Sequence, residues 1–148
     1  MAKLKIPERA WIVVCDGAKA LVLENIGDEK YPNFQTREVF EEPHATTNEQ
    51  GTDAPGRVHN SVGSARSSVE QTDWHDQSER QFLGKLIARL DAAVMAGQVK
   101  SLIMVAPPRA LGVIRQAYSQ RMREVLRQEV DKDLVKMPLH EIEKYLAG

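Results

Sequence analysis

Ala10-Trp-Ile-Val-Val-Cys15 is an unbroken apolar run that is rich in β-branched residues. Such a run is typical of a strand buried on both faces, and we therefore expect it in the middle of a sheet. Asp16-Gly17 is a turn signal, and Lys19-Ala-Leu-Val-Leu-Glu24 follows it as a second strand. So short a connection predicts that the two strands form an antiparallel hairpin.

Two segments beyond this hairpin carry a clear period. Residues 34–42 alternate and carry charge on both faces, which predicts a third strand near an edge of the sheet. Residues 76–96 place apolar side chains at helical spacing. Asp76 and Glu79 resemble a capping box at the start of this helix, and Gly97 is suited to its end.

The remaining elements come from the last third of the chain. Residues 101–106 form another buried strand, and Pro107-Pro108 ends it and opens a helix that continues to Met122. Residues 124–133 fit either more of that helix or a short edge strand, and we favour the strand. Pro138 opens a last helix. The order β-β-β-α-β-α-β-α predicts an α/β protein of ribonuclease-H-like fold, a mixed five-stranded sheet with helices on its faces.

Composition restricts the class of protein. The 148 residues fit one domain, and 42% hydrophobic and 28% charged residues are ordinary values for a globular protein. A net charge of −1 does not indicate attraction of the whole surface to nucleic acid or to an anionic membrane, but it permits a local patch. The single cysteine excludes an internal disulfide framework. With no signal-peptide pattern and no apolar run of membrane-spanning length, we expect no membrane partner and a cytoplasmic location.

Residues 43–73 differ from the rest of the chain. They are rich in Gly, Ser, Thr, Asn, Asp and His and hold almost no large apolar side chains. We interpret them as one long polar loop within the single domain. A connection of this length is typical of either a functional loop or a mobile one, and the sequence leaves both open.

Five motifs occur in order over almost the whole chain: Trp11-Ile-Val-Val-Cys-Asp-Gly-Ala-Lys-Ala-Leu-Val-Leu, Asp73-Trp-His, Glu79-Arg-Gln-Phe-Leu, Ala106-Pro-Pro-Arg-Ala-Leu-Gly and Lys132-Asp-Leu. Together they resemble the bacterial family called "protein required for attachment to host cells", a name that records a phenotype and no mechanism. That family is similar to the middle domain of archaeal and eukaryotic class I release factors, which has the ribonuclease-H-like order. The resemblance implies association with ribosomes or RNA through a long polar loop. The release factor's Gly-Gly-Gln is absent here, so peptide release by that route is not expected.

The candidate binding residues fall in two groups. The polar loop supplies Gly56, Arg57, His59 and Ser61, in the place where the release factor carries its glycine-rich loop. The C-terminal third supplies a basic set that could contact RNA phosphates, and a mixed, solvated helix face is the alternative because acidic residues are interspersed. This set is Arg109, Arg115, Arg121 and Arg123.

Other chemistry-bearing residues have weaker patterns. Asp16 and Glu24 could begin the carboxylate set of a two-metal nuclease, although Asp16 also fits a turn residue that bonds local backbone. The histidines of the polar segment fit no established zinc spacing. Cys15, within an apolar strand, is expected to be a small buried hydrophobe.

The sequence therefore predicts a non-catalytic binding module for ribosomes or RNA, with no cofactor and no metal. Two alternatives stay open: a metal-dependent nuclease of ribonuclease-H-like fold, and a protein-interaction module that is indirectly required for host attachment. A homo-oligomer also stays open, because an edge strand and a polar loop are available for contact.

Overall fold

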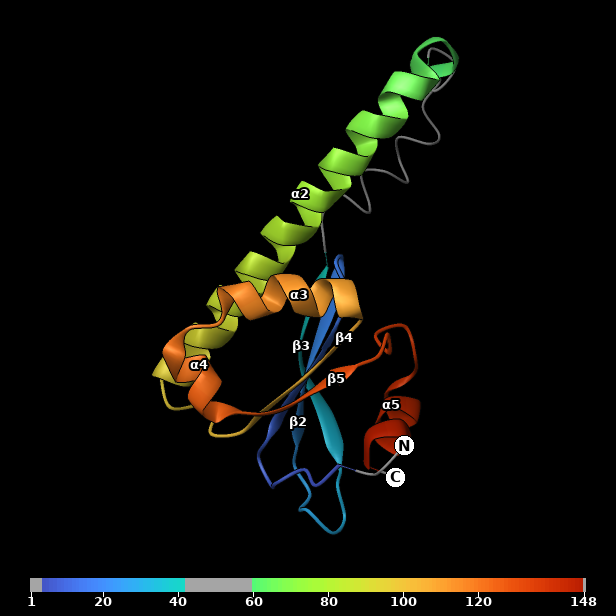
Figure 1. Ribbon diagram of the computed structural model, residues 1–148. Coiled ribbons are helices and arrows are strands. Elements are labelled where there is room, and N and C mark those ends of the chain that lie inside the picture. Colours follow the sequence, from blue (N-terminus) through green and yellow to red (C-terminus); the bar gives the residue numbers. More distant parts are fainter. Residues whose placement is uncertain (1–3, 42–59, 148) are drawn as a thin grey trace.

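A mixed five-stranded sheet with helices on both faces forms the body of the protein (Figure 1). The computed structural model describes residues 4–41 and 60–147, and for residues 60–76 it describes the backbone alone. The strands are β1 (Trp11–Cys15), β2 (Lys19–Asn25), β3 (Phe34–Glu41), β4 (Leu102–Ala106) and β5 (Leu126–Asp131). The described helices are α2 (Asn60–Met95), α3 (Pro108–Ala117), α4 (Gln120–Val125) and α5 (Leu139–Ala147).

The strand order is β3-β2-β1-β4-β5. Strand β2 runs antiparallel to β1 and β3, whereas β1, β4 and β5 are parallel. The predicted hairpin, the central place of the first strand and the edge place of the third are confirmed. The strand favoured within residues 124–133 is also confirmed, because β5 forms the other edge.

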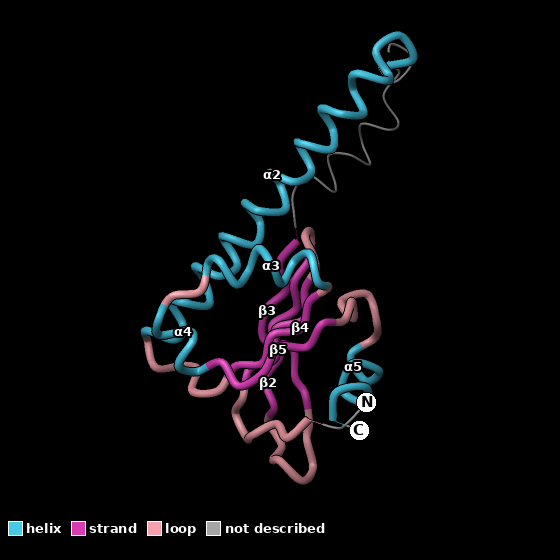
Figure 2. The backbone as a smooth tube through the Cα atoms, viewed as in Figure 1, coloured by secondary structure: helices cyan, strands magenta, loops and turns pink. Residues whose placement is uncertain are grey.

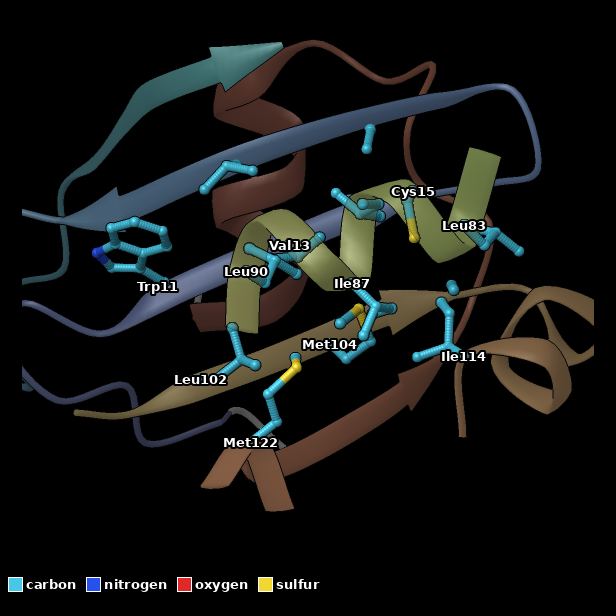
Figure 3. Close-up of a cluster of buried hydrophobic side chains, with 14 of the residues drawn as sticks. Trp11, Val13, Cys15, Leu83, Ile87, Leu90, Leu102, Met104, Ile114 and Met122 are labelled. Carbon is cyan, nitrogen blue, oxygen red and sulfur yellow. The ribbon is translucent and has the colours of Figure 1, made fainter. Parts of the chain in front are cut away.

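Alternate side chains of the central strands build two cores, one on each face of the sheet. Trp11, Val13 and Cys15 of β1 pack under α2, α3 and α4, together with Met104 of β4 (Figure 3). The side chains between them on β1 and β4 face α5 and the N-terminal segment. The helices α2, α3 and α4 therefore cover one face of the sheet and α5 covers the other (Figure 2).

Helix α2 is longer than the sequence predicted. It begins at Asn60, so residues 60–73, which we expected to be loop, are helical. Asp76 and Glu79 lie well inside the helix and do not form a cap. Among the side chains of α2 that the structure describes, those in the core begin at Phe82, and the N-terminal half of the helix extends beyond the sheet (Figure 1). The rest of the predicted loop, residues 43–59, lies outside the described residues.

The C-terminal end of α2 follows the prediction. Gly97 has a φ of 79°, a left-handed conformation that favours glycine. Its N–H donates to the carbonyl of Val94, and the next N–H, of Gln98, donates to the carbonyl of Ala93, each at 3.0 Å. This pair of bonds is the Schellman motif, and it turns the chain into β4.

The helix predicted from Pro107 through Met122 is divided in two. Tyr118 and Ser119 adopt extended conformations between α3 and α4. The Ser119 hydroxyl accepts a bond from the backbone N–H of Met122 at 3.1 Å and donates to Asp91 of α2 at 2.6 Å. Ser119 thus caps α4 and fastens it to α2.

Candidate functional site

Three of the four candidates predicted in the polar loop lie outside the described residues. These are Gly56, Arg57 and His59. Ser61 lies in the first turn of α2, so its backbone is helical and does not belong to a loop as predicted. Of the predicted binding residues, only the basic ones of the C-terminal third therefore have side chains that the structure describes.

The four candidate arginines lie on the side of the sheet that α2 covers. Arg109 and Arg115 belong to α3, and Arg121 and Arg123 belong to α4. Helices α3 and α4 pack on the C-terminal half of α2, so the sheet carries these arginines on one face (Figures 1 and 2). The fold brings together residues that span fifteen positions of sequence and adds the cations of α2 to them.

Three of these arginines form ion pairs with carboxylates. The three guanidinium groups stay 44–67% exposed, and exposed pairs of this kind contribute little to stability. The pairs are Arg109 with Glu79 at 3.4 Å, Arg115 with Glu129 at 2.8 Å, and Arg121 with Asp91 at 3.3 Å. Arg123 donates to the backbone carbonyl of Arg115 at 3.3 Å.

Glu129 of β5 joins two residues from the end of α3. It accepts hydrogen bonds from the Arg115 Nε at 2.8 Å and from the Tyr118 hydroxyl at 2.9 Å. The pKa of Tyr118 is raised, first by burial and then by the hydrogen bond to Glu129. The hydrogen bond and the charge of Glu129 also raise the pKa of Arg115. Through these bonds Glu129 holds α3 and the residue that ends it against β5.

Positive charge is concentrated on this side of the sheet. From Gln77 onward, helices α2, α3 and α4 carry seven Arg or Lys residues and three Asp or Glu residues. The chain as a whole has a net charge of −1. Glu38 of β3 and Glu129 of β5 pair with Arg89 and Arg115 and reduce this excess from four to two. The described part of the three helices thus forms a positively charged face, which we call the α2–α4 face, on a slightly acidic protein.

A groove runs along this face between α2 and α3, at the carboxyl ends of β1 and β4. The part between the two helices has a volume of about 260 Å³ and is lined by Arg80 and Leu83 of α2 and by Gly112 and Gln116 of α3, among others. An adjoining part reaches the β1–β2 turn at Gly17. The carboxyl ends of parallel strands are where open α/β sheets commonly bind ligands.

Glu79, Arg109 and Ala110 line both parts of the groove. A Cβ added to Gly17 would come within 2.2 Å of the Glu79 Oε1 atom, so glycine is needed for this approach. Neither Glu79 nor the groove residues Arg80, Gly112 and Gln116 were predicted as binding residues. Only Gly112 carried a signal, because an isolated glycine inside a helical pattern calls for a packing or functional reason.

Asp16 and Glu24 do not share a site. Asp16 follows the carboxyl end of β1, and its Oδ1 accepts the backbone N–H groups of Ala18 and Lys19, each at 2.8 Å. Glu24 pairs with Trp11 at the opposite end of β1. Its carboxylate is bound by Arg9 and, at 2.7 Å, by Arg37. The metal-binding pair suggested by sequence is therefore not formed, and Asp16 acts as the turn residue.

Other potential ligands or nucleophiles are dispersed. In residues 4–41 and 77–147, no group of three or more His, Cys, Asp or Glu side chains is placed to hold a metal ion. Cys15 is fully buried, and burial, followed by the charge of Asp16, raises the pKa of its thiol to about 12. A thiol in this state is a weak nucleophile, as expected of a buried hydrophobe.

Among the helices described, none combines the length and the apolar character that crossing a membrane requires. A search of curated proteins found no match. A family model described as "Protein required for attachment to host cells" matches residues 11–146. The match includes every strand, the described helices α2, α3 and α4, and all but the last residue of α5. The chain therefore belongs to the family of proteins required for attachment to host cells.

Proposed function

We propose that this protein is a non-catalytic module that binds RNA, free or within the ribosome, through the α2–α4 face. The uneven distribution of charge carries the proposal: the described part of the three helices holds seven basic residues against three acidic ones of its own and the two strand carboxylates that pair with it, Glu38 and Glu129, on a chain whose net charge is −1. Contacts between Arg or Lys and phosphates supply most of the sequence-independent affinity for nucleic acid. A local positive face is therefore sufficient even when the whole protein is slightly acidic.

The topology supports a finer assignment of the fold. The order β3-β2-β1-β4-β5, in which β2 alone runs against its neighbours, agrees with a ribonuclease-H-like sheet. Such an assignment is consistent with a resemblance to the release-factor middle domain in fold and in an RNA-facing surface, without the Gly-Gly-Gln. Under this proposal, the requirement for attachment to host cells is an indirect consequence of RNA binding.

The nuclease alternative has less support. It relied on Asp16 and Glu24, which lie at opposite ends of β1. Asp16 is engaged by two backbone N–H groups, and Glu24 by two arginines. A two-metal mechanism needs carboxylates that converge on ions a few ångströms apart, which these two residues do not provide.

RNA binding can be measured by fluorescence anisotropy with a labelled single-stranded RNA of mixed sequence, at about 50 and 200 mM salt. The double variant Arg121→Gln/Arg123→Gln removes two exposed cations of α4. We expect it to weaken binding roughly tenfold at the lower salt concentration and to reduce the salt slope by about 1 to 2, as for two lost phosphate contacts.

The matched control is Lys30→Gln/Lys144→Gln, which changes the net charge equally at sites off the α2–α4 face. Lys30 lies in the β2–β3 connection and Lys144 on α5. Affinity close to that of the unmodified protein would show that the position of the charges matters. The proposal fails if the unmodified protein shows no salt-sensitive binding to this RNA and stays in the free fraction when sedimented with ribosomes at low salt.

A further inference from the structure

Two glycines lie on the exposed sides of two neighbouring helices. Gly84 lies in α2 and Gly112 in α3, and an added Cβ at either position would meet no atom within 4 Å. Glycine is less favourable than alanine inside a helix, and neither position has a close contact that requires it. Gly112 lines the groove and Gly84 does not. A glycine at position 112 keeps space open above the groove.

The groove combines an aliphatic floor with polar rims. Leu83, Ala110 and Val113 line the groove, and Val113 supplies its accessible apolar surface because Leu83 and Ala110 are almost fully buried. Arg80 and Gln116 line the rims from α2 and α3. The described residues give Arg80 no hydrogen bond or ion pair, so its guanidinium can bind an anion. The occupant should therefore have a flat or apolar body, an edge that can hydrogen-bond and a negative charge.

We infer that this groove is a subsite for one unpaired nucleotide of the bound RNA, an inference that rests on the proposed function. The base lies over Gly112 and Val113, its edge bonds to the Gln116 amide, and the phosphate pairs with Arg80. The volume of about 260 Å³ is close to the lower limit of ligand pockets and suits one nucleotide. Unstacked bases are the parts of RNA that proteins read most directly, and guanidinium planes can stack on them.

The two prolines at the start of α3 explain why a side chain would bind the phosphate. Pro107 and Pro108 carry no backbone N–H, which weakens the anion-binding ability of this helix terminus. Glu79 lies in the same groove, and its ion pair with Arg109 at 3.4 Å offsets its charge. Glu79→Gln should therefore tighten the binding of a phosphate-bearing ligand by a few-fold, whereas a cationic ligand would bind more weakly to this variant.

The test compares Gly112→Leu with Gly84→Leu. Both place the same side chain on an exposed helical glycine with open space around it, and only the first fills the groove. ¹⁵N amide shifts on titration with adenosine 5′-monophosphate, with ribose 5-phosphate and with inorganic phosphate report local binding. Anisotropy reports the affinity for single-stranded RNA. We expect Gly112→Leu to abolish the nucleotide-induced shifts around residues 80–84 and 109–116 and to weaken RNA binding at least five-fold.

Gly84→Leu should leave both measurements unchanged. Arg80→Gln should weaken binding, and Lys85→Gln, a cation of α2 that does not line the groove, should not. If both leucine variants bind RNA as the unmodified protein does, the subsite is wrong while the proposed function stands. If the unmodified protein binds no RNA, the proposed function fails and the subsite with it. Mononucleotide binding that RNA does not displace would identify a free nucleotide as the ligand and overturn the RNA assignment.

Discussion

At the scale of single residues, Asn25 joins segments that are distant in sequence. It is fully buried at the end of β2. Its Nδ2 donates to the carbonyl of Ile6 at 2.9 Å, and its Oδ1 accepts the backbone N–H groups of Gly27 at 3.0 Å and Asn33 at 2.9 Å. One amide thereby fixes the N-terminal segment and both ends of the β2–β3 connection.

Asn25→Ala should lower the free energy of unfolding by about 2–4 kcal/mol, because several buried backbone groups lose their partner together. Urea denaturation measures this loss. Asn33→Ala is the control, since the Asn33 side chain is exposed and its bonded group is the backbone N–H; we expect a change within about 0.5 kcal/mol. Equal losses in the two variants would contradict the role assigned to Asn25.

Glycines at two sites should respond to alanine with opposite signs. Gly84 is helical and has open space around it, so Gly84→Ala should stabilise the protein by about 0.5–1 kcal/mol. Gly97 has a φ of 79°, so Gly97→Ala should destabilise it by about 1–2 kcal/mol. Thermal denaturation of both variants checks the two signs, and a shift in the same direction would refute this explanation.

The Cys15 thiol should make stability fall at alkaline pH. Its pKa is raised from 9.0 to about 12 in the folded state, so the unfolded chain ionises first as the pH rises. The stabilisation is complete below pH 9 and is lost between about pH 9 and 12, by about 1.4 kcal/mol per pH unit. Tyr118, whose pKa is also raised, contributes with the same sign at higher pH.

Comparing urea unfolding at pH 8 and pH 10.5 isolates the thiol. The unmodified protein should lose about 2 kcal/mol more stability between these pH values than Cys15→Ala, which has no thiol to ionise. An equal loss in both proteins would show that the thiol is not the group responsible.

At the scale of elements, the break between α3 and α4 depends on one serine. Ser119 caps α4 through the N–H of Met122 and bonds Asp91 of α2 at 2.6 Å. Ser119→Ala should destabilise the protein by about 1–2 kcal/mol, the cost of a lost cap together with a lost hydrogen bond. The control is Ser78→Ala, the same change at another half-buried serine. Ser78 makes no side-chain hydrogen bond with the described residues, so we expect its change in stability to stay below about 0.5 kcal/mol. Chemical denaturation would contradict the assignment if the two variants lost the same amount.

The elements show how far sequence reasoning reached. Strand β1 was predictable because a strand buried on both faces is apolar throughout. Strand β3 was predictable as an edge because it carries charge on both faces. The start of α2 at Asn60 was missed, since a helix that extends beyond its core needs no apolar stripe and leaves no period to detect. The groove was missed because Glu79 and Gly112 come from different helices and meet only through packing. The pairing of Arg121 with Asp91, thirty positions away, was hidden for the same reason.

At the scale of the whole molecule, charge is unevenly distributed along the chain. The α2–α4 face has an excess of basic residues, which leaves the remainder of the chain net negative. One edge of the sheet carries features that disfavour pairing with a second copy. Strand β3 is charged, and its register shifts between Val22 and Leu23 of β2, an irregularity that protects edge strands from association.

This uneven distribution of charge predicts behaviour that the net charge alone would not. At pH 7.5 the protein is above its sequence pI of about 6.4, so a molecule with evenly mixed charges should pass through an immobilised polyanion such as heparin. We expect retention at about 50 mM salt and elution by a few hundred millimolar, because the α2–α4 face can turn toward the polyanion. Arg121→Gln/Arg123→Gln should elute earlier, and Lys30→Gln/Lys144→Gln should elute with the unmodified protein. Flow-through of the unmodified protein at low salt would show that the arginine–carboxylate pairs neutralise the face. The electrostatic attraction proposed for RNA would then be absent.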